Sequence, residues 1–456
     1  MSVSAQRVGG LLIYAAPAAV SAFLTSPVAT VLPGIYAKYF AVPLTTVAFL
    51  TLLVRVTDAI SDPLLGYLSD RRFERTGSRL DFIVGGAGGM TIAAWFLFNP
   101  PSNVGALWFG AWLLLFYIGW SAFEIPHNAW GAALATGYAE RARLYGYRGF
   151  AFYVGGMLFY LIPMLPIFGS HAITPAVLRL SVLVGIAMFA VSLLLARRLP
   201  LCARGPERER ESLAQLLHSV AGNRPLVLFL LAYFFAGVGF GMWGGLLYVV
   251  IDSYLKLGER VAFVFLAGTP VALLCIPIWS RLMARYGKRE AWLVSSAGLA
   301  LALAGGALLS PGPNSFGWLV ALTLALFALA SCQAVVAPAI LADIADYGRW
   351  KFGQDRAGSY YATLSITGKA ISSFGAAASL GLAGMLGFEP AAREFSDGAI
   401  HGLKIAFAVV PGLCVAASLP LIWWTPINPR HLDILQKRLK RRDARAATTM
   451  TSRSAQ

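Results

Sequence analysis

The sequence is poor in charged, histidine and cysteine residues for its length. Only 13% of its 456 residues are Asp, Glu, Lys or Arg, whereas 58% are hydrophobic and the mean hydropathy is +0.67. A soluble domain of this size needs far more polar surface, so the composition excludes one. The five histidines and four cysteines show no metal-ligand or disulfide spacing and no catalytic dyad, so we do not expect an enzyme.

Acidic residues are scarcer than basic ones, 21 against 37, which gives a net charge of +16. A charge of this size could indicate nucleic-acid binding. Most Lys and Arg, however, lie in the N-terminus, in alternate loops or in the tail, which is the positive-inside distribution of a multi-pass membrane protein. We therefore expect a lipid bilayer rather than nucleic acid as the partner. Both termini are expected in the cytoplasm, and the membrane is expected to be the plasma or bacterial inner membrane.

Apolar runs of roughly 20 residues recur along the chain, and each is long enough to cross a bilayer as a helix. The runs are continuously apolar rather than alternating, which is not the pattern of a β-barrel. We predict an all-α membrane protein with 12 transmembrane helices. The predicted spans are 9–32, 43–69, 80–98, 104–134, 146–168, 174–198, 223–252, 260–283, 289–309, 314–343, 358–386 and 402–425.

One long polar segment separates six spans from the next six, and the two halves are similar. A short basic turn that contains glycine follows the second span at 66–79 and the eighth at 281–289. Two pseudo-symmetric six-helix bundles with a site between them at mid-membrane form one transporter architecture. The predicted parts are an N-terminal bundle (1–198), a cytoplasmic linker (199–222), a C-terminal bundle (223–428) and a basic cytoplasmic tail (429–456). We expect a monomer.

The second predicted span carries two aspartates, Asp58 and Asp62, on one helix face, with Arg55 three residues before the first. A charge at mid-bilayer costs about 2.5–3.5 kcal/mol even on mild insertion scales, so such residues usually handle an ion, a proton or a substrate. Two neighbouring carboxylates in a low dielectric cannot both stay ionised without a partner, so a proton or a cation such as Na⁺ binds. The alternative is an Arg55–Asp58 pair that only locks the helix.

Polar residues in three other spans are further candidates for the site. Ser121 and Glu124 share one face of the fourth span and could add oxygen ligands to the aspartates. Lys369 is the only cation deep in the second half; it either pairs with the acids of the second span or the substrate, or extends to one membrane face. His127 is a substrate contact or a packing residue, and Arg148 is a substrate contact or a positive-inside residue.

Several motifs match a known family. The stretch Asp-Ala-Ile-Ser-Asp-Pro-Leu-Leu-Gly at 58–66 resembles the Asp-Ala-x-x-Asp-Pro-x-x-Gly signature of the glycoside–pentoside–hexuronide:cation symporters, the melibiose-permease-like family of the major facilitator superfamily. The loop 66–79 is similar to the superfamily's cytoplasmic loop motif. Glu-Ile-Pro at 124–126 resembles the family's Asp-Ile-Pro, and Gly-Lys at 368–369 matches a family lysine. The resemblance covers nearly the whole chain.

The resemblance implies site residues on several helices. The family's cation site corresponds to Asp58, Asp62, Ser121 and Glu124, and Na⁺ is possible as a metal ion at Asp58, Asp62 and Glu124. The predicted substrate-binding residues are Glu124, Arg148, Lys369, Asn128 and His127. Charge pairing or gating is predicted for Arg55, Asp70 and Arg71. No resident cofactor is expected, because Na⁺ or H⁺ serves as the coupling ion.

The chain departs from the family's sugar binders at two places. The first span has no acid within 15–25, where those proteins carry an aspartate, and Asn128 stands where they have a tryptophan. A less polar or an anionic substrate is therefore compatible with the sequence. We predict a secondary active transporter that couples Na⁺ or H⁺ to the symport of a small organic solute, a sugar or sugar acid, by alternating access. A symporter of lysolipids or other amphipathic solutes is the alternative; a channel would not need acids in one half and a lysine in the other.

Overall fold

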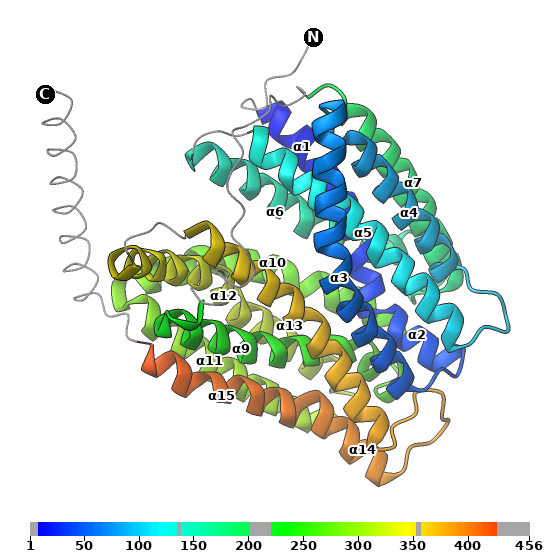
Figure 1. The fold of residues 1–456 in the computed structure, drawn as a ribbon. Coiled ribbons are helices and arrows are strands. Elements are labelled where there is room, and N and C mark those ends of the chain that lie inside the picture. The colour runs from blue at the N-terminus through cyan, green and yellow to red at the C-terminus, as the bar shows by residue number, and fades with distance from the viewer. Residues whose placement is uncertain (1–7, 135–137, 200–219, 353–356, 426–456) are drawn as a thin grey trace, which may run out of the picture.

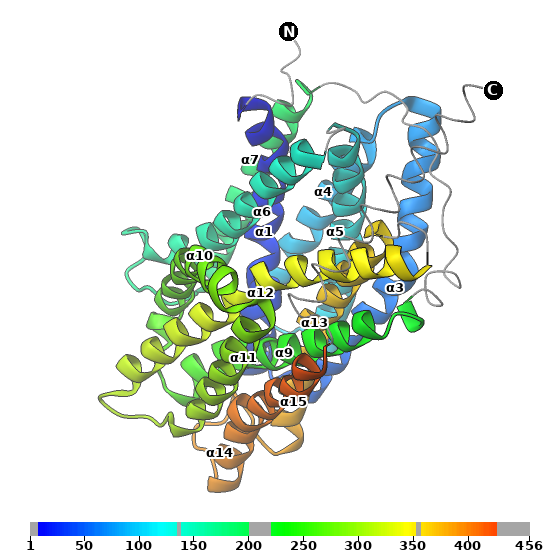
Figure 2. The same cartoon turned by 90° about the vertical axis from the view of Figure 1, so that its left-hand side faces the viewer.

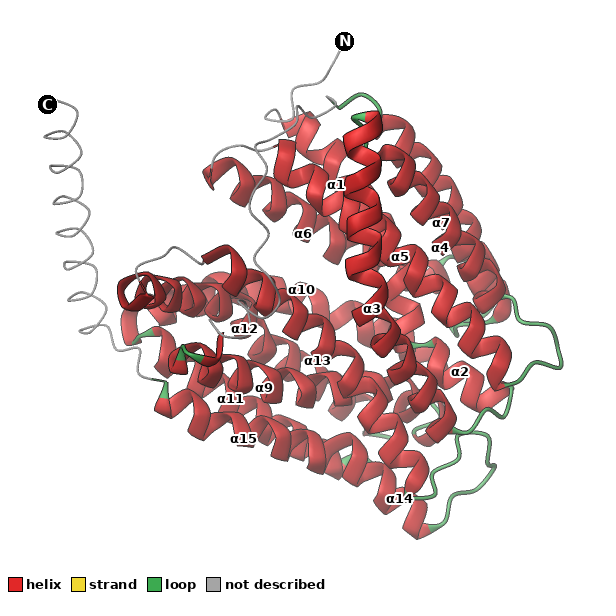
Figure 3. Ribbon diagram, in the orientation of Figure 1, coloured by secondary structure: helices red, strands yellow, loops and turns green. Residues whose placement is uncertain are grey.

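The computed structural model describes residues 8–134, 138–199, 220–352 and 357–425. Within these ranges every regular element is a helix (Figure 3). The long helices are α1 (Val8–Thr30), α3 (Leu44–Thr76), α4 (Leu80–Phe98), α5 (Ala106–Leu134), α6 (Tyr138–Leu161), α7 (Pro175–Ala196), α9 (Arg224–Val249), α10 (Val261–Tyr286), α11 (Lys288–Gly305), α12 (Ser315–Phe352), α13 (Ala357–Met385) and α15 (Val410–Trp424). Two short helices, α2 (Leu32–Tyr39) and α14 (Asp397–Lys404), precede α3 and α15. The predicted tail and residues 200–219 of the linker lie outside the described residues.

Ten segments of the described chain are long and apolar enough to cross a membrane. The predicted twelve include two more, at 146–168 and 358–386, where the structure has α6 and α13. These two helices are not apolar enough to count among the ten, because they contain hydroxyl side chains and charged ones such as Arg148 and Lys369. The helices that are least suited to lipid are therefore two of those that carry the predicted site.

Glycines with positive φ mark the same turn in each half. Gly77 ends α3 with φ 69°, and Gly287 separates α10 from α11 with φ 106°. Residues with a Cβ rarely adopt this backbone, so glycine permits an abrupt reversal between two helices. The two turns are those that the sequence identified as a repeat, at 66–79 and 281–289.

The helices form two groups, which we call the N-terminal half (α1–α7) and the C-terminal half (α9–α15). In the first, α4 packs on α5 and α1 on α6; in the second, α9 packs on α13 and α15, and α10 on α12. The ribbons of the two halves meet near α2 and α14 and diverge toward the end where α1 begins and α15 ends (Figures 1 and 2). We call the meeting end the closed end.

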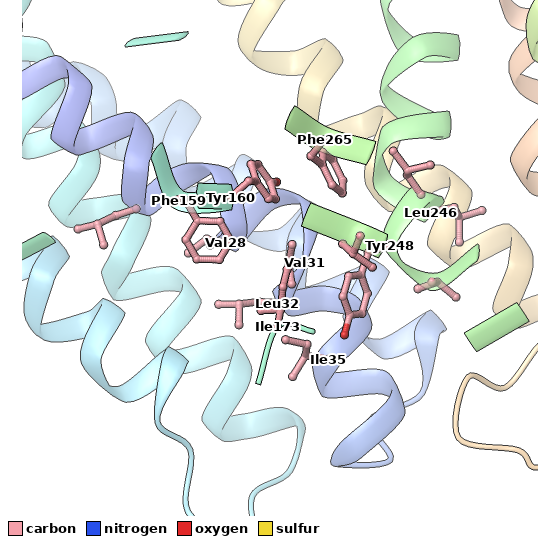
Figure 4. Close-up of a cluster of buried hydrophobic side chains, with 14 of the residues drawn as sticks. Val28, Val31, Leu32, Ile35, Phe159, Tyr160, Ile173, Leu246, Tyr248 and Phe265 are labelled. Carbon is pink, nitrogen blue, oxygen red and sulfur yellow. The ribbon is translucent and has the colours of Figure 1, made fainter. Parts of the chain in front are cut away.

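Large apolar side chains fill the contact between the halves at the closed end (Figure 4). The rings of Tyr160 on α6 and Phe265 on α10 stack with centroids 4.7 Å apart. Gly34 of α2 lies against the Tyr248 ring of α9, where any Cβ would clash. Val31 and Leu32 beside it are completely buried. Burial of this apolar surface stabilises the closed end.

Helices α3 and α13 continue this contact toward the middle of the molecule. Gly384 packs against Leu44 and Thr45, and Gly381 packs against Ala48 further along. Small residues let the two backbones approach closely, as in other membrane helix pairs. The line of contact leads to the charged residues of α3.

Candidate functional site

Asp58 and Asp62 on α3 each bind a basic side chain. Arg55 Nη1 donates to Asp58 Oδ2 at 2.7 Å within one turn of the helix. Lys369 Nζ of α13 donates to Asp62 Oδ2, also at 2.7 Å. The second pair joins the two halves, so any proton or cation that binds Asp62 acts directly on the contact between them.

Aromatic rings of α5 support both bases. The Arg55 guanidinium lies 4.1 Å from the centre of the Tyr117 ring, and the Lys369 ammonium lies 5.4 Å from that of Trp120. The negative faces of such rings attract cations. Trp120 is fixed in turn, because its Nε1 donates to Ser21 Oγ of α1 at 3.0 Å. Helices α1, α3, α5 and α13 thus meet around the Lys369 ammonium.

Glu124 belongs to a second charged group, formed by α5 and α6. Its Oε1 accepts hydrogen bonds from Arg148 Nη2 and, at 3.2 Å, from Asn128 Nδ2. Arg148 Nε also donates to His127 Nδ1 at 3.5 Å. Tyr145 Oη donates to the main-chain carbonyl of Asn128 at 2.8 Å and so joins α6 to α5. Four residues predicted to bind substrate therefore lie together, and Lys369 lies in the other group.

His127 is completely buried, and both of its ring nitrogens are engaged. Nε2 lies 3.0 Å from the main-chain oxygen of Tyr14, and the ring stacks between those of Tyr14 and Phe123. Because Arg148 can only donate, Nδ1 accepts and Nε2 carries the proton. This arrangement favours the packing and hydrogen-bonding interpretation of His127, because the ring is completely buried and both nitrogens are engaged; its contact with substrate stays a prediction.

Six polar atoms of α3 and α5 are buried without a hydrogen-bond partner in the described structure. They are Arg55 Nε, Asp58 Oδ1, Ser61 Oγ, Asp62 Oδ1, Ser121 Oγ and Glu124 Oε2. Each of the four predicted cation ligands contributes one of the oxygens. An unsatisfied buried polar group is destabilising by about 1–3 kcal/mol, so a concentration of them points to a proton or ligand that binds there.

The three carboxylates do not converge on one point. Among the described residues, no three His, Cys, Asp or Glu side chains are placed to hold a metal ion. Glu124 binds Arg148 on α6, whereas Asp58 and Asp62 bind bases on α3 and α13. A single Na⁺ bound by all three therefore does not fit this conformation, because each acid is held by its own base; binding by the two aspartates remains a prediction.

The residues predicted for charge pairing differ in their surroundings. Arg55 is paired, as described above. Asp70 accepts a hydrogen bond from Arg79 Nη1 at 2.7 Å, within the N-terminal half. Arg71 is exposed and forms no ion pair in the described part of the chain, so its predicted pairing is absent from this conformation.

The closed end contains polar contacts that the sequence analysis missed. Lys38 Nζ of α2 donates to Asp252 Oδ2 at 2.7 Å, in a π-helical turn (Val250–Tyr254) that ends α9. Ser170 Oγ donates to Glu259 Oε1 at 3.0 Å. Both contacts join the two halves. No sequence pattern links residues so far apart in the chain.

Three residues at the centre were also missed. Ser61 lies three residues after Asp58, and Tyr117 lies four before Ser121, so helical spacing could have placed both on the site face. Tyr14 offers no such signal, because its contacts with His127 come from the packing of α1 on α5.

A family model described as "MFS/sugar transport protein" matches residues 13–429. The uncharacterized symporter YjmB of Bacillus subtilis (strain 168) is 22% identical over 416 residues, which cover 88% of this chain and 89% of that protein. The uncharacterized symporter sll1374 of Synechocystis sp. (strain ATCC 27184 / PCC 6803 / Kazusa) is 28% identical over 243 residues, 47% of this chain and 44% of that protein.

Solved structures share the fold. A bacterial homologue of the human lysosomal transporter Spinster, inward-facing and unoccupied, superposes with a TM-score of 0.66 at 16% identity, covering 91% of this chain and 96% of that one. The nucleoside transporter NupG gives a TM-score of 0.63 at 12% identity, covering 92% of this chain and all of the other. The match to the family model confirms the resemblance found in the sequence. The protein is a multi-pass integral membrane protein, and it belongs to the MFS/sugar transport protein family of the major facilitator superfamily.

Proposed function

We propose that the protein is a secondary active transporter that couples Na⁺ or H⁺ to the symport of a small organic solute of the sugar or sugar-acid type. The observation that carries this proposal is the Asp62–Lys369 ion pair, which joins the two halves beside carboxylate oxygens that lack hydrogen-bond partners. The family description and the name of YjmB as a symporter support it.

The proposed cycle alternates access at the two ends. With cytoplasmic termini, the diverging end faces the cytoplasm and the closed end faces outward. A proton or Na⁺ at Asp58 and Asp62 weakens the hold of Asp62 on Lys369, because the carboxylate charge is neutralised. Solute then binds near Arg148 and Lys369, and the halves rock about the occupied site. A ligand drives this motion only by binding the two conformations with different affinities.

The lysolipid alternative has one observation in its favour. A groove of about 590 Å³ between α4 and α5 is lined by glycines and apolar side chains, with Arg72 and Asp81 at one end. A single acyl chain with a charged headgroup has the matching chemistry. The groove contains no residue of the three ion pairs Arg55–Asp58, Lys369–Asp62 and Arg148–Glu124, so we place a soluble organic solute first.

The coupling ion can be identified without the solute. We expect the melting temperature of the purified protein to rise with either Na⁺ or falling pH, because a ligand that binds only the folded state stabilises it by about 2.7 kcal/mol at 100 times its Kd. The D62N variant should lose this response. Asp343 is the matched control, since it also pairs with a lysine, Lys288 Nζ at 2.6 Å, but lies outside the site. A D62N protein that responds like wild type would refute the proposed cation site.

A further inference from the structure

The charges at the centre of the molecule balance without any ligand. Three carboxylates and three bases occupy the interiors of α3, α5, α6 and α13, and each acid forms an ion pair with one base. The pairs are Arg55–Asp58, Lys369–Asp62 and Arg148–Glu124. All three acids have less than a quarter of the side chain exposed. Within the described residues the group therefore carries no net formal charge.

His127 also lies at these pairs, and a histidine side chain can take up a proton near neutral pH, but here it leaves this balance unchanged. His127 accepts from Arg148 through Nδ1 and faces the Tyr14 carbonyl through Nε2. A second ring proton would point at the guanidinium N–H and add a positive charge beside it. The hydrogen bonds thus hold the imidazole in its neutral form.

A coupling ion upsets this balance. One Na⁺ or one proton added at Asp58 and Asp62 leaves the group with a charge of +1. A buried charge that lacks a counterion is strongly unfavourable in a membrane interior. An uncharged solute would not remove it, whereas a solute with one negative charge would restore neutrality.

We propose that the organic substrate of this site is a monoanion, which crosses together with one cation as an electroneutral pair. The inference rests on the proposed function and names the substrate class for it. In this proposal the negative charge of the solute binds the bases of the site. Recognition does not depend mainly on hydrogen bonds from the solute's hydroxyl groups to the acids.

Two bases are placed to receive the anion. A cation at Asp62 weakens the bond between that carboxylate and the Lys369 ammonium, and the Lys369 side chain is already 35% exposed. Arg148 uses Nε and Nη2 for His127 and Glu124, while its Nη1 makes no hydrogen bond with the described residues. A guanidinium held at two positions presents the remaining nitrogen in a fixed direction, which suits a carboxylate or phosphate oxygen.

The test compares one sugar acid with its uncharged amide. Binding of D-glucuronate and D-glucuronamide is measured by thermal shift and calorimetry on the purified full chain, with the coupling ion saturating. The two probes have the same ring and hydroxyl groups and differ in charge. We expect the acid to bind at least about tenfold more tightly than the amide.

Variants then reverse or preserve that preference. R148Q removes one base, so the group becomes neutral when only the cation is bound, and the amide should now bind better than the acid. R148K keeps the charge and should keep the preference for the acid, which separates loss of charge from loss of folding. K288Q removes a lysine that is also paired with an aspartate but lies outside the group, and it should behave as wild type.

Three results would overturn the monoanion proposal: equal binding of acid and amide, tighter binding of the amide to the wild type, or no binding of the acid. Uptake into proteoliposomes adds a second readout, since electroneutral uptake of D-glucuronate should not change when a potassium diffusion potential is imposed. The proposed function fails separately. If neither Na⁺ nor pH alters the stability of the wild type, cation coupling is wrong whatever the two sugars show.

Discussion

The two halves of the molecule share a helical repeat but differ in what their interiors contain. In the N-terminal half, α3, α5 and α6 carry three acids and two bases, together with buried oxygens that lack partners. In the C-terminal half, the corresponding interior is aromatic, with Trp243 packed against Phe240, Phe327 and Phe407. Among its described residues, only Lys369 contributes to the charged group. The acids that could bind a coupling ion thus lie in the N-terminal half. The C-terminal half contacts them through the ammonium of Lys369.

This asymmetry explains how an ion could control a movement of whole helices. If both halves held complete sites, binding in one would not affect the other. Because Asp62 and Lys369 lie on different halves, the state of one carboxylate alters the contact between them. The apolar side chains at the closed end form a second joint between the halves, and the contact of α3 with α13 connects it to this pair.

The largest expected effect comes from breaking the joint at the centre. D62N removes the carboxylate charge that binds the Lys369 ammonium, and it also removes a proposed cation ligand. The two side chains are partly exposed, 23% for Asp62 and 35% for Lys369, so losing the pair costs less than the ~3–5 kcal/mol of a fully buried one. Because Asp62 is also a proposed cation ligand, we still expect cation-driven uptake to fall by at least about 100-fold. Uptake into proteoliposomes under a Na⁺ or pH gradient is the measurement. The D343N control breaks a pair inside the C-terminal half and should retain most of the activity.

The same substitution at one tryptophan of each half should have different consequences. W120A removes the ring beneath Lys369, so solute affinity should fall by about tenfold with a small effect on folding. W243A empties a fully buried aromatic cluster and should lower stability by about 3–5 kcal/mol. Binding and thermal melts on both variants separate these outcomes. A stability loss as large in W120A as in W243A would contradict the assignment of chemistry to the N-terminal half.

Helix positions followed from the sequence because hydrophobic runs and turn glycines are local signals. The span predicted at 80–98 has the bounds of α4, whereas α3 and α12 continue beyond the predicted ends, to Thr76 and Phe352. Those extensions are amphiphilic and basic, so the hydrophobic run ends several residues before the helical hydrogen bonds of the backbone end. Boundaries set by polarity alone are therefore short at the charged membrane face.

The central pairs were only partly predictable. The spacing of three residues along α3 was enough to predict the Arg55–Asp58 pair. Because charged residues are rare in the spans, an acid of α3 could also be expected as a partner of Lys369. The Arg148–Glu124 pair depends on how α6 packs against α5, which no local pattern encodes. The sequence therefore left Glu124 in two predicted groups, the cation site and the substrate site, and packing places it beside Arg148 and Asn128 of the second.

Breaking the joint at the closed end should have a smaller effect than breaking the central one. K38Q removes the ion pair between Lys38 and Asp252 but leaves the apolar contact around it in place, so we expect a shift of about 1 kcal/mol toward opening at that end. Cysteine labelling of a V31C protein, at a completely buried position of the closed end, should be about fivefold faster with K38Q than without it. R72Q, which removes an exposed pair within one half, should leave the rate unchanged.

The smallest effects test the structural repeat itself. G77A places a Cβ in the left-handed region with no atoms nearby, so its penalty is that of the backbone alone, about 1–2 kcal/mol. G287A meets a less accessible backbone region and also the Glu290 carboxylate, so it should cost more, about 2–3 kcal/mol. Thermal melts of both variants in one detergent provide the comparison. An equal loss in the two proteins would mean that the repeated turns bear the same strain, despite their different φ angles.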